Sequence, residues 1–200
     1  MKKYLKNLLL TLIGCFIFIN PSIASENYPQ VEIVTTSGTF TLELDRNRAP
    51  LSVENFLGYV EEGFYTNIIF HRVMEGFVIQ TGGFTTEYEE KKTKPEIANE
   101  SGNGLKNSRM TLGMARLNEP HTASSQFYIN LADNFRLDPT LTRWGYAVFG
   151  SVISGFEVVA AIGANATQTF INDDGKEFEN LPVAPIIILE AKKLVFENDR

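Results

Sequence analysis

The sequence predicts a mainly β fold, a closed antiparallel barrel capped at its ends by two α-helices. Its 200 residues suit a single domain, because no internal repeat, low-complexity tract or linker divides them. Short apolar runs separated by Gly, Asn and Asp recur along most of the chain, as in proteins built from many short strands. Only two segments show the 3.6-residue apolar period of an amphipathic helix. Closure into a barrel would leave no unprotected edge strand.

The first segment, residues 1–24, has the three parts of a secretory signal peptide. Lys2, Lys3 and Lys6 form a basic start, Leu8–Ile19 is a largely apolar run, and Ser22–Ala24 supplies small residues for cleavage. The apolar run is shorter than the roughly 20 residues of a spanning helix, which argues against a retained membrane anchor. We therefore expect cleavage after about residue 24, a single mature domain over residues 25–200, and a periplasmic or secreted protein.

A lipoprotein is the alternative interpretation of this leader. Leu12–Cys15 is similar to the cleavage box of bacterial lipoproteins and would leave Cys15 lipidated, but Phe16–Ile19 stays apolar where a lipoprotein usually turns polar. Cleavage after residue 24 would remove three lysines and the only cysteine, and would take the formal net charge from -6 to -9. The mature chain would then have no disulfide, no catalytic thiol and no thiolate zinc site.

The mature chain begins with a predicted hairpin. Val31–Thr36 and Thr39–Leu44 flank a two-residue turn at Ser37–Gly38. Apolar and polar residues alternate along the second strand, which predicts one buried face made of Phe40, Leu42 and Leu44.

A helix is predicted next, with Pro50 near its start, Ser52 as a possible cap and Gly63 as its end. Its apolar positions at helical spacing are Val53, Phe56, Leu57 and Val60. A second, shorter helix is predicted from the capping-box pattern of Ser154 and Glu157, and it closes at Gly163.

The remaining strands are predicted from short apolar runs. They cover Ile68–Val73, Phe77–Gln80, Thr111–Ala115, Gln126–Asn130, Ala147–Val152 and Ile186–Val195. Two stretches, Glu87–Lys94 and Asn165–Leu181, are predicted to be solvated connections, or alternatively loops that bias the choice of client at the mouth of a groove.

Composition and motifs exclude several classes of protein. With 44% hydrophobic and 21% charged residues the chain is not disordered, collagen-like or a coiled coil, and its acidic charge offers no clustered basic face, so no nucleic acid partner is expected. No G-x-S-x-G, P-loop or G-x-G-x-x-G motif occurs, and the two histidines lack metal-site spacing, so no metal or cofactor is expected. A hydrolase triad could be assembled from Ser124 or Ser125 with His121 and Asp133, but such residues occur in any chain and no strand-turn-helix elbow surrounds the serines.

One stretch, Phe70–Phe84, places a lone arginine in an apolar, aromatic setting, with Gln80 eight residues after Arg72 and a glycine pair behind it. Alone, such an arginine would indicate only the exposed face of a strand. Further segments have the same mixed character: Gly113–Arg116, Ser125–Ile129, Phe135–Asp138 and Tyr146–Gly150.

Together these segments resemble the cyclophilins, which are peptidyl-prolyl cis/trans isomerases, and most closely the bacterial periplasmic members. The resemblance runs from Val31 to Val195 and rests on F-H-R-V-x-x-x-F-x-x-Q-x-G followed by S-Q-F-Y-I. It implies an eight-stranded antiparallel barrel closed at each end by a helix.

The resemblance also implies the site. Arg72 would be the catalytic arginine and Gln80 its hydrogen-bonding companion. Ala115 and Arg116 would pair with the substrate through main-chain groups, so the side chain of Arg116 would matter less. The other substrate-binding positions are Phe77, Val78, Gln126, Tyr128, Leu137 and Tyr146. The implied partners are proline-containing peptides and unfolded or nascent secreted proteins, with a monomeric enzyme and no cofactor; the alternative is a proline-peptide-binding chaperone without catalysis.

Three positions depart from the family pattern. Val78 stands where Met is frequent, and Tyr128 stands where Phe is frequent and adds a hydroxyl that needs a partner. Arg136 occupies the place of a Trp or Phe beside the pocket, while Phe135, on strand parity, would face away. The third departure implies weak cyclosporin binding, because a guanidinium must stay hydrated.

Overall fold

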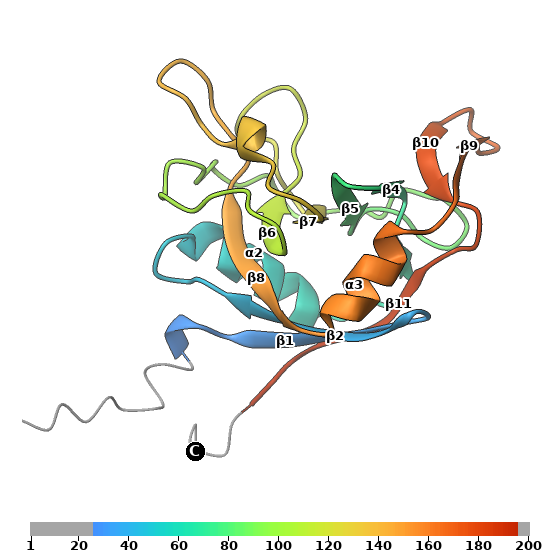
Figure 1. Cartoon of the computed structure of the whole chain (residues 1–200), viewed down its shortest axis with the longest axis horizontal. Helices are drawn as coiled ribbons and strands as arrows, with labels where there is room; N and C mark the ends of the chain where they lie inside the picture. The colour runs from blue at the N-terminus through green and yellow to red at the C-terminus, as the bar shows by residue number, and fades with distance from the viewer. Residues whose placement is uncertain (1–25, 196–200) are drawn as a thin grey trace, which may run out of the picture.

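The computed structural model describes residues 26–195 and confirms a mainly β fold with two helices (Figure 1). The predicted signal peptide and Cys15 lie outside the described residues. One sheet contains nine strands: β1 (Gln30–Thr35), β2 (Gly38–Leu44), β3 (Ile68–Ile69), β4 (Arg72–Met74), β5 (Val78–Thr81), β6 (Thr111–Met114), β7 (Phe127–Asn130), β8 (Val148–Ser154) and β11 (Ile187–Lys193). No helix within residues 26–195 is long and apolar enough to cross a membrane.

The sheet is a curled array and differs from the predicted ring of eight strands. Its order is β3-β11-β1-β2-β8-β6-β7-β5-β4, and its two outermost strands follow one another in the chain. The run Ile68–Val73, predicted as one strand, divides into β3, which pairs with β11, and β4, which pairs with β5. Within the described residues no ladder joins β3 to β4. Phe70 and His71 link the two strands along the chain, and β3 also contacts the segment after β5, where the Ile69 N–H donates to the Phe84 carbonyl oxygen.

Apolar side chains from the sheet and from α2 (Pro50–Glu61) form the main core. Burial of Phe40, Leu42 and Leu44 confirms the predicted alternation along β2. The apolar positions predicted at helical spacing along α2 are also buried. The ring of Phe56 packs edge-on against the ring of Phe127, with the two ring centroids 5.1 Å apart. The second helix, α3 (Phe156–Gly163), contributes Val159 and Ile162 to the same core.

The helix caps differ from those predicted. Ala49 is the N-cap of α2, and Ser52 lies inside the first turn, where its N–H and hydroxyl both donate to the Glu100 carboxylate. The capping box at α3 is wrong as well, because Ser154 ends β8 and Gly155, at φ 75°, is the N-cap. A carboxylate distant in sequence and a left-handed glycine replace the local side-chain caps.

Two further boundaries concern turns. Gly63, at φ 65°, ends α2 as predicted, because glycine adopts this left-handed conformation without steric cost. The turn of the first hairpin lies at Thr36 and Ser37, one residue earlier than predicted, since Thr35 pairs with Gly38.

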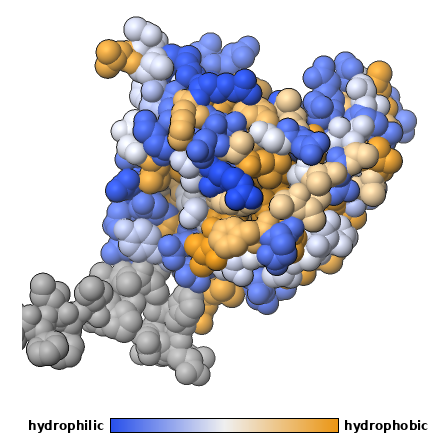
Figure 2. Space-filling view, viewed as in Figure 1, coloured by the Kyte–Doolittle hydropathy of each residue, from blue (hydrophilic) through white to orange (hydrophobic). Residues whose placement is uncertain are grey.

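The segment Asn165–Leu181, predicted to be a solvated connection, contains a hairpin. Strands β9 (Thr167–Ile171) and β10 (Glu177–Pro182) pair in a separate two-stranded sheet. Phe178 is buried edge-on against Phe84, with ring centroids 5.0 Å apart, so apolar contact holds the hairpin on the main sheet. The hairpin projects from the body of the molecule, and a notch separates it from the loops on the other side (Figures 1 and 2). Glu87–Lys94, in contrast, forms no helix or strand.

Candidate active site

A row of cross-strand neighbours builds the wall of the site. On the register of the sheet, Arg72 of β4 is opposite Gln80 of β5, which is opposite Tyr128 of β7, which is opposite Gly113 of β6. Directly opposed residues lie on the same face of a sheet, so these side chains stand side by side. The neighbouring row faces the core and consists of Val73, Ile79, Ile129 and Leu112. Because side chains alternate between faces, the row of Arg72 points outward.

This outer face carries a cavity of about 420 Å³. It is lined by Arg72, Phe77, Val78, Gln80, Ala115, Arg116, Tyr128, Arg136, Leu137 and Tyr146. The structure thus brings together every site residue predicted from the sequence except Gln126, and it includes Arg136, which the family pattern placed beside the pocket. The wall combines apolar and aromatic side chains with the polar side chains of Gln80 and three arginines, so it can hold an apolar group and donate hydrogen bonds to it at the same time.

Gln126 does not line the cavity, but its half-buried side chain ends a chain of hydrogen bonds that begins at Arg72. The Arg72 guanidinium donates to the Gln80 Oε1 at 3.3 Å, and the Gln80 amide donates to the Gln126 Oε1 at 3.0 Å. Space for Gln126 comes from Gly83, where a Cβ would stand only 2.5 Å from the Gln126 amide nitrogen. The glycine pair noted in the sequence therefore admits the side chain that orients Gln80, and Gln80 orients Arg72.

The hydroxyl of Tyr128 has the partner that its burial requires. It donates to the Asn107 Oδ1 at 2.6 Å, and the backbone N–H of Asn107 donates to the Asp138 carboxylate at 2.9 Å. Burial raises the pKa of Tyr128 well above its usual value, so the hydroxyl stays protonated at neutral pH. The ring lies across Gly113, where a Cβ would meet it at 2.2 Å.

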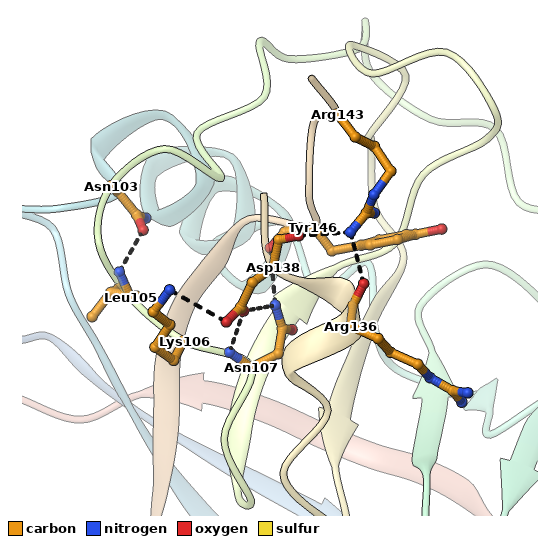
Figure 3. Close-up of polar contacts among 8 residues, drawn as sticks. All are labelled: Asn103, Leu105, Lys106, Asn107, Arg136, Asp138, Arg143 and Tyr146. Carbon is orange, nitrogen blue, oxygen red and sulfur yellow. Dashed lines mark hydrogen bonds and ion pairs between the residues drawn. The ribbon is translucent and has the colours of Figure 1, made fainter. Parts of the chain in front are cut away.

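A loop with a 3-10 turn, η1 (Phe135–Leu137), forms the opposite wall. The Arg143 guanidinium donates to the carbonyl oxygens of Arg136 and Asp138, each at 2.8 Å (Figure 3). This segment is a 3-10 turn and not a strand, so the alternation of side chains expected for Phe135 and Arg136 does not apply. Phe135 is nevertheless exposed and outside the cavity, which Arg136 and Leu137 line.

The side chain of Arg116 has a larger structural part than the sequence predicted. Its guanidinium stacks 4.4 Å from the Tyr146 ring centroid. It donates to four carbonyl oxygens, those of Gly145, Leu117, Asn118 and Trp144. Arg116 therefore fixes the loop that carries Tyr146.

Sequence reasoning missed the polar residues that hold the loops in place, Asn107, Asp138 and Arg143. Their partners lie up to 39 residues away, as between Asn107 and the carbonyl oxygen of Tyr146, and no local pattern marks them. The buried carboxylate of Asp138 accepts both the backbone and the side-chain N–H of Asn107, which is a structural role.

The side chains that could have formed a hydrolase triad or a metal site make other contacts. The hydroxyl of Ser125 donates to the Gly82 carbonyl, and the Nδ1 of His121 accepts from the Asn99 N–H. Within residues 26–195 no hydrogen bond joins His121 to Ser124, Ser125 or Asp133, so these residues do not form a hydrolase triad. Within residues 26–195 no group of three or more His, Cys, Asp or Glu side chains could hold a metal ion. Burial, with smaller contributions from Arg72 and Lys176, lowers the pKa of His71 to about 3, so this imidazole is neutral.

Comparisons with known proteins agree on one family. The model of the cyclophilin-type peptidyl-prolyl cis-trans isomerases matches residues 30–193. The chain is 43% identical over 173 residues to peptidyl-prolyl cis-trans isomerase A of Dickeya dadantii, covering 86% of this chain and 88% of that protein. It is 48% identical over 136 residues to isomerase B of Escherichia coli, covering 66% and 83% of the two chains. A cyclophilin-type isomerase of Cryptosporidium parvum, crystallised in the presence of the dipeptide Ala-Pro, aligns with a TM-score of 0.67 at 26% identity, covering 84% and 99%.

Proposed function

The chain belongs to the cyclophilin family and is a peptidyl-prolyl cis-trans isomerase, and we propose that Arg72 and Gln80 catalyse this reaction on proteins that fold outside the cytoplasm. The observation that carries the residue assignment is Arg72, held by Gln80, on the same cavity wall as the apolar side chains of Phe77, Val78 and Leu137. The Ala-Pro dipeptide named with the Cryptosporidium structure supports a proline peptide as the ligand of this cavity.

The chemistry needs one well-placed donor. Rotation about an X-Pro bond has a barrier of roughly 18–20 kcal/mol, because twisting removes the amide resonance and localises a lone pair on the prolyl nitrogen. Arg72 presents an always-charged N–H that stabilises this lone pair, and Gln80 holds the guanidinium in place. The apolar wall formed by Phe77, Val78 and Leu137 holds the proline ring and excludes water, which strengthens the interaction. No covalent intermediate is involved.

Exchange NMR on an X-Pro peptide tests this activity. The purified protein at catalytic concentration should broaden the cis and trans signals of the peptide by accelerating their exchange. Chemical-shift changes on binding without faster exchange would instead identify a proline-peptide-binding chaperone and refute catalysis.

The predicted leader supports action outside the cytoplasm, where proline isomerisation still takes tens of seconds. The proposal includes cleavage after about Ala24, export to the periplasm or medium, and a monomeric mature enzyme acting on unfolded or nascent secreted chains. Mass spectrometry of the protein recovered from its own cells should give an N-terminus near Ser25. A lipidated Cys15 at the N-terminus, or an uncleaved chain in the cytosol, would contradict this localisation.

A further inference from the structure

The cavity carries positive charge in an acidic protein. Its wall includes three arginines, Arg72, Arg116 and Arg136, and no carboxylate. The whole chain, in contrast, has a formal net charge of -6. The charge at the cavity is therefore opposite in sign to that of the molecule as a whole.

The three arginines differ in how many hydrogen bonds their guanidinium groups already make within the protein. Arg72 donates to Gln80, and Arg116 donates to four carbonyl oxygens. The Arg136 guanidinium makes no hydrogen bond or ion pair within residues 26–195. It stacks 4.5 Å from the Phe77 ring centroid. In Figure 3 it extends away from the contacts that join Arg143 and Asp138 to the same loop.

The backbone of Arg136 is nevertheless held in place by hydrogen bonds. The carbonyl oxygen of Arg136 accepts from the Arg143 guanidinium, and the neighbouring Asp138 carboxylate holds Asn107. The Arg136 guanidinium carbon lies 4.5 Å from the Phe77 ring centroid, and its N–H groups donate to no residue within 26–195. Two N–H groups of a guanidinium match the two oxygens of a carboxylate. The free group at the cavity rim is thus suited to a carboxylate on a bound ligand.

From this geometry we propose that Arg136 makes the site select proline peptides that carry an aspartate or glutamate next to the proline. The inference rests on the proposed function, since it names the substrate class of the same cavity. Arg136 acts on specificity, and its guanidinium contacts the side chain that flanks the proline, whereas Arg72 acts on the prolyl nitrogen.

Two electrostatic effects oppose each other here. The net negative charge of the protein repels an acidic peptide, but at physiological ionic strength charges beyond about 8 Å are largely screened. A direct pair with Arg136 lies within that distance. Exposed pairs contribute about 0.2–1 kcal/mol, so the expected preference for an acid is about 1.4- to 5-fold in kcat/KM. The local pair therefore outweighs the distant charges.

The test uses peptides that differ at one residue, with Glu, Gln or Lys placed either directly before or directly after the proline. The ratio of kcat/KM for Glu over Gln should be about 1.4 to 5 in at least one position, and the Lys peptide should be the poorest there. Raising the salt concentration should bring the ratio towards one, because the pair is exposed.

Three variants test whether Arg136 is the residue that causes the preference for the Glu peptide. Arg136→Gln should bring the Glu-to-Gln ratio close to one, and Arg136→Glu should favour the Lys peptide. Arg48→Ala removes the same charge from an exposed residue that does not line the cavity, and it should keep the wild-type ratio. Thermal melts verify that each variant is folded.

A ratio of one in both positions for the wild type, or a preference that persists in Arg136→Gln, would overturn the inference. The result remains separable from the proposed function, because the affinities of the same peptides, measured by NMR titration, give the Glu-to-Gln ratio even without turnover. Absence of turnover on the Gln peptides would contradict catalysis alone.

Discussion

At the scale of single residues, Arg72 decides whether the cavity catalyses or only binds. Because its donor interaction with the prolyl nitrogen forms mainly as the amide twists, Arg72→Ala should lower kcat/KM far more than it weakens peptide binding. Loss of one preorganised donor costs about 2.7–4 kcal/mol in comparable sites, which is a hundred- to thousandfold decrease. Arg72→Lys should recover part of the activity, since a lysine lacks the planar fork.

Exchange rates on an X-Pro peptide, together with a thermal melt, check this prediction. Arg72 is half-buried on the outer face of the sheet, so the variant should stay folded. Near-normal exchange in a folded Arg72→Ala protein would refute the catalytic assignment, and a large loss of thermal stability would show that Arg72 is a structural residue.

A second residue-scale prediction concerns acid stability. The unfolded chain protonates His71 below pH of about 6.5, whereas the folded pKa is lowered to about 3. The stability that this difference contributes is present above pH 6.5 and is lost as the pH falls from 6.5 towards 3, by up to about 1.4 kcal/mol per pH unit. Denaturant unfolding of wild type and His71→Leu between pH 7 and 4 should show a weaker pH dependence in the variant. His121→Gln, which replaces an exposed histidine, should leave the wild-type slope largely intact.

A third residue-scale prediction concerns cyclosporin. Arg136 presents a hydrated charge where an aromatic side chain would offer a flat apolar surface, so the wild type should bind the drug weakly. Arg136→Trp should tighten binding in a calorimetric titration. Phe135→Trp is the matched control, because Phe135 is next in sequence, exposed and outside the cavity, and it should change little. Tight binding by the wild type would show that Arg136 does not obstruct the drug.

At the scale of elements, the hairpin β9–β10 depends on a small apolar cluster. Phe178 is 4% exposed and packs on Phe84, whereas Ile171 of the same hairpin is 60% exposed. Phe178→Ala should cost about 3–5 kcal/mol of local or global stability, as large-to-small changes of buried aromatic residues usually do. Ile171→Ala should change stability by no more than about 0.5 kcal/mol. Hydrogen exchange of the hairpin amides measures both, and equal effects would mean that the hairpin is not anchored through Phe178.

At the scale of the whole molecule, one core joins the two ends of the described chain. The main cluster runs from Val31 to Ala191, and β11 lies between β1 and β3 in the sheet. No large part of the sheet can therefore separate without exposing this core, and we expect a single cooperative unfolding transition. Far-UV and near-UV circular dichroism should give the same midpoint in urea. Two separated midpoints would indicate that the hairpin or another part unfolds independently.

The class of the fold, the two helices and nearly all residues of the cavity wall could be predicted from the amino-acid sequence. Alternation made Phe40, Leu42 and Leu44 recognisable as core, because a strand repeats every two residues and needs no distant partner to show it. Arg72, Gln80 and Tyr128 were recognisable through family motifs, each confined to a short stretch of chain.

How these stretches meet depends on contacts between residues that are distant in the sequence. The division of Ile68–Val73 into two strands depends on pairing with β11 and β5. In the first turn of α2, the N–H of Ser52 donates to the carboxylate of Glu100, which lies 48 residues away in the sequence. The hairpin β9–β10 was missed because its buried Phe178 finds its partner, Phe84, on a distant segment. Arg136 stood out in the sequence only as a departure from the family pattern. Its free guanidinium became visible once the fold had placed it over Phe77, because contacts between distant segments leave no periodic trace in the chain.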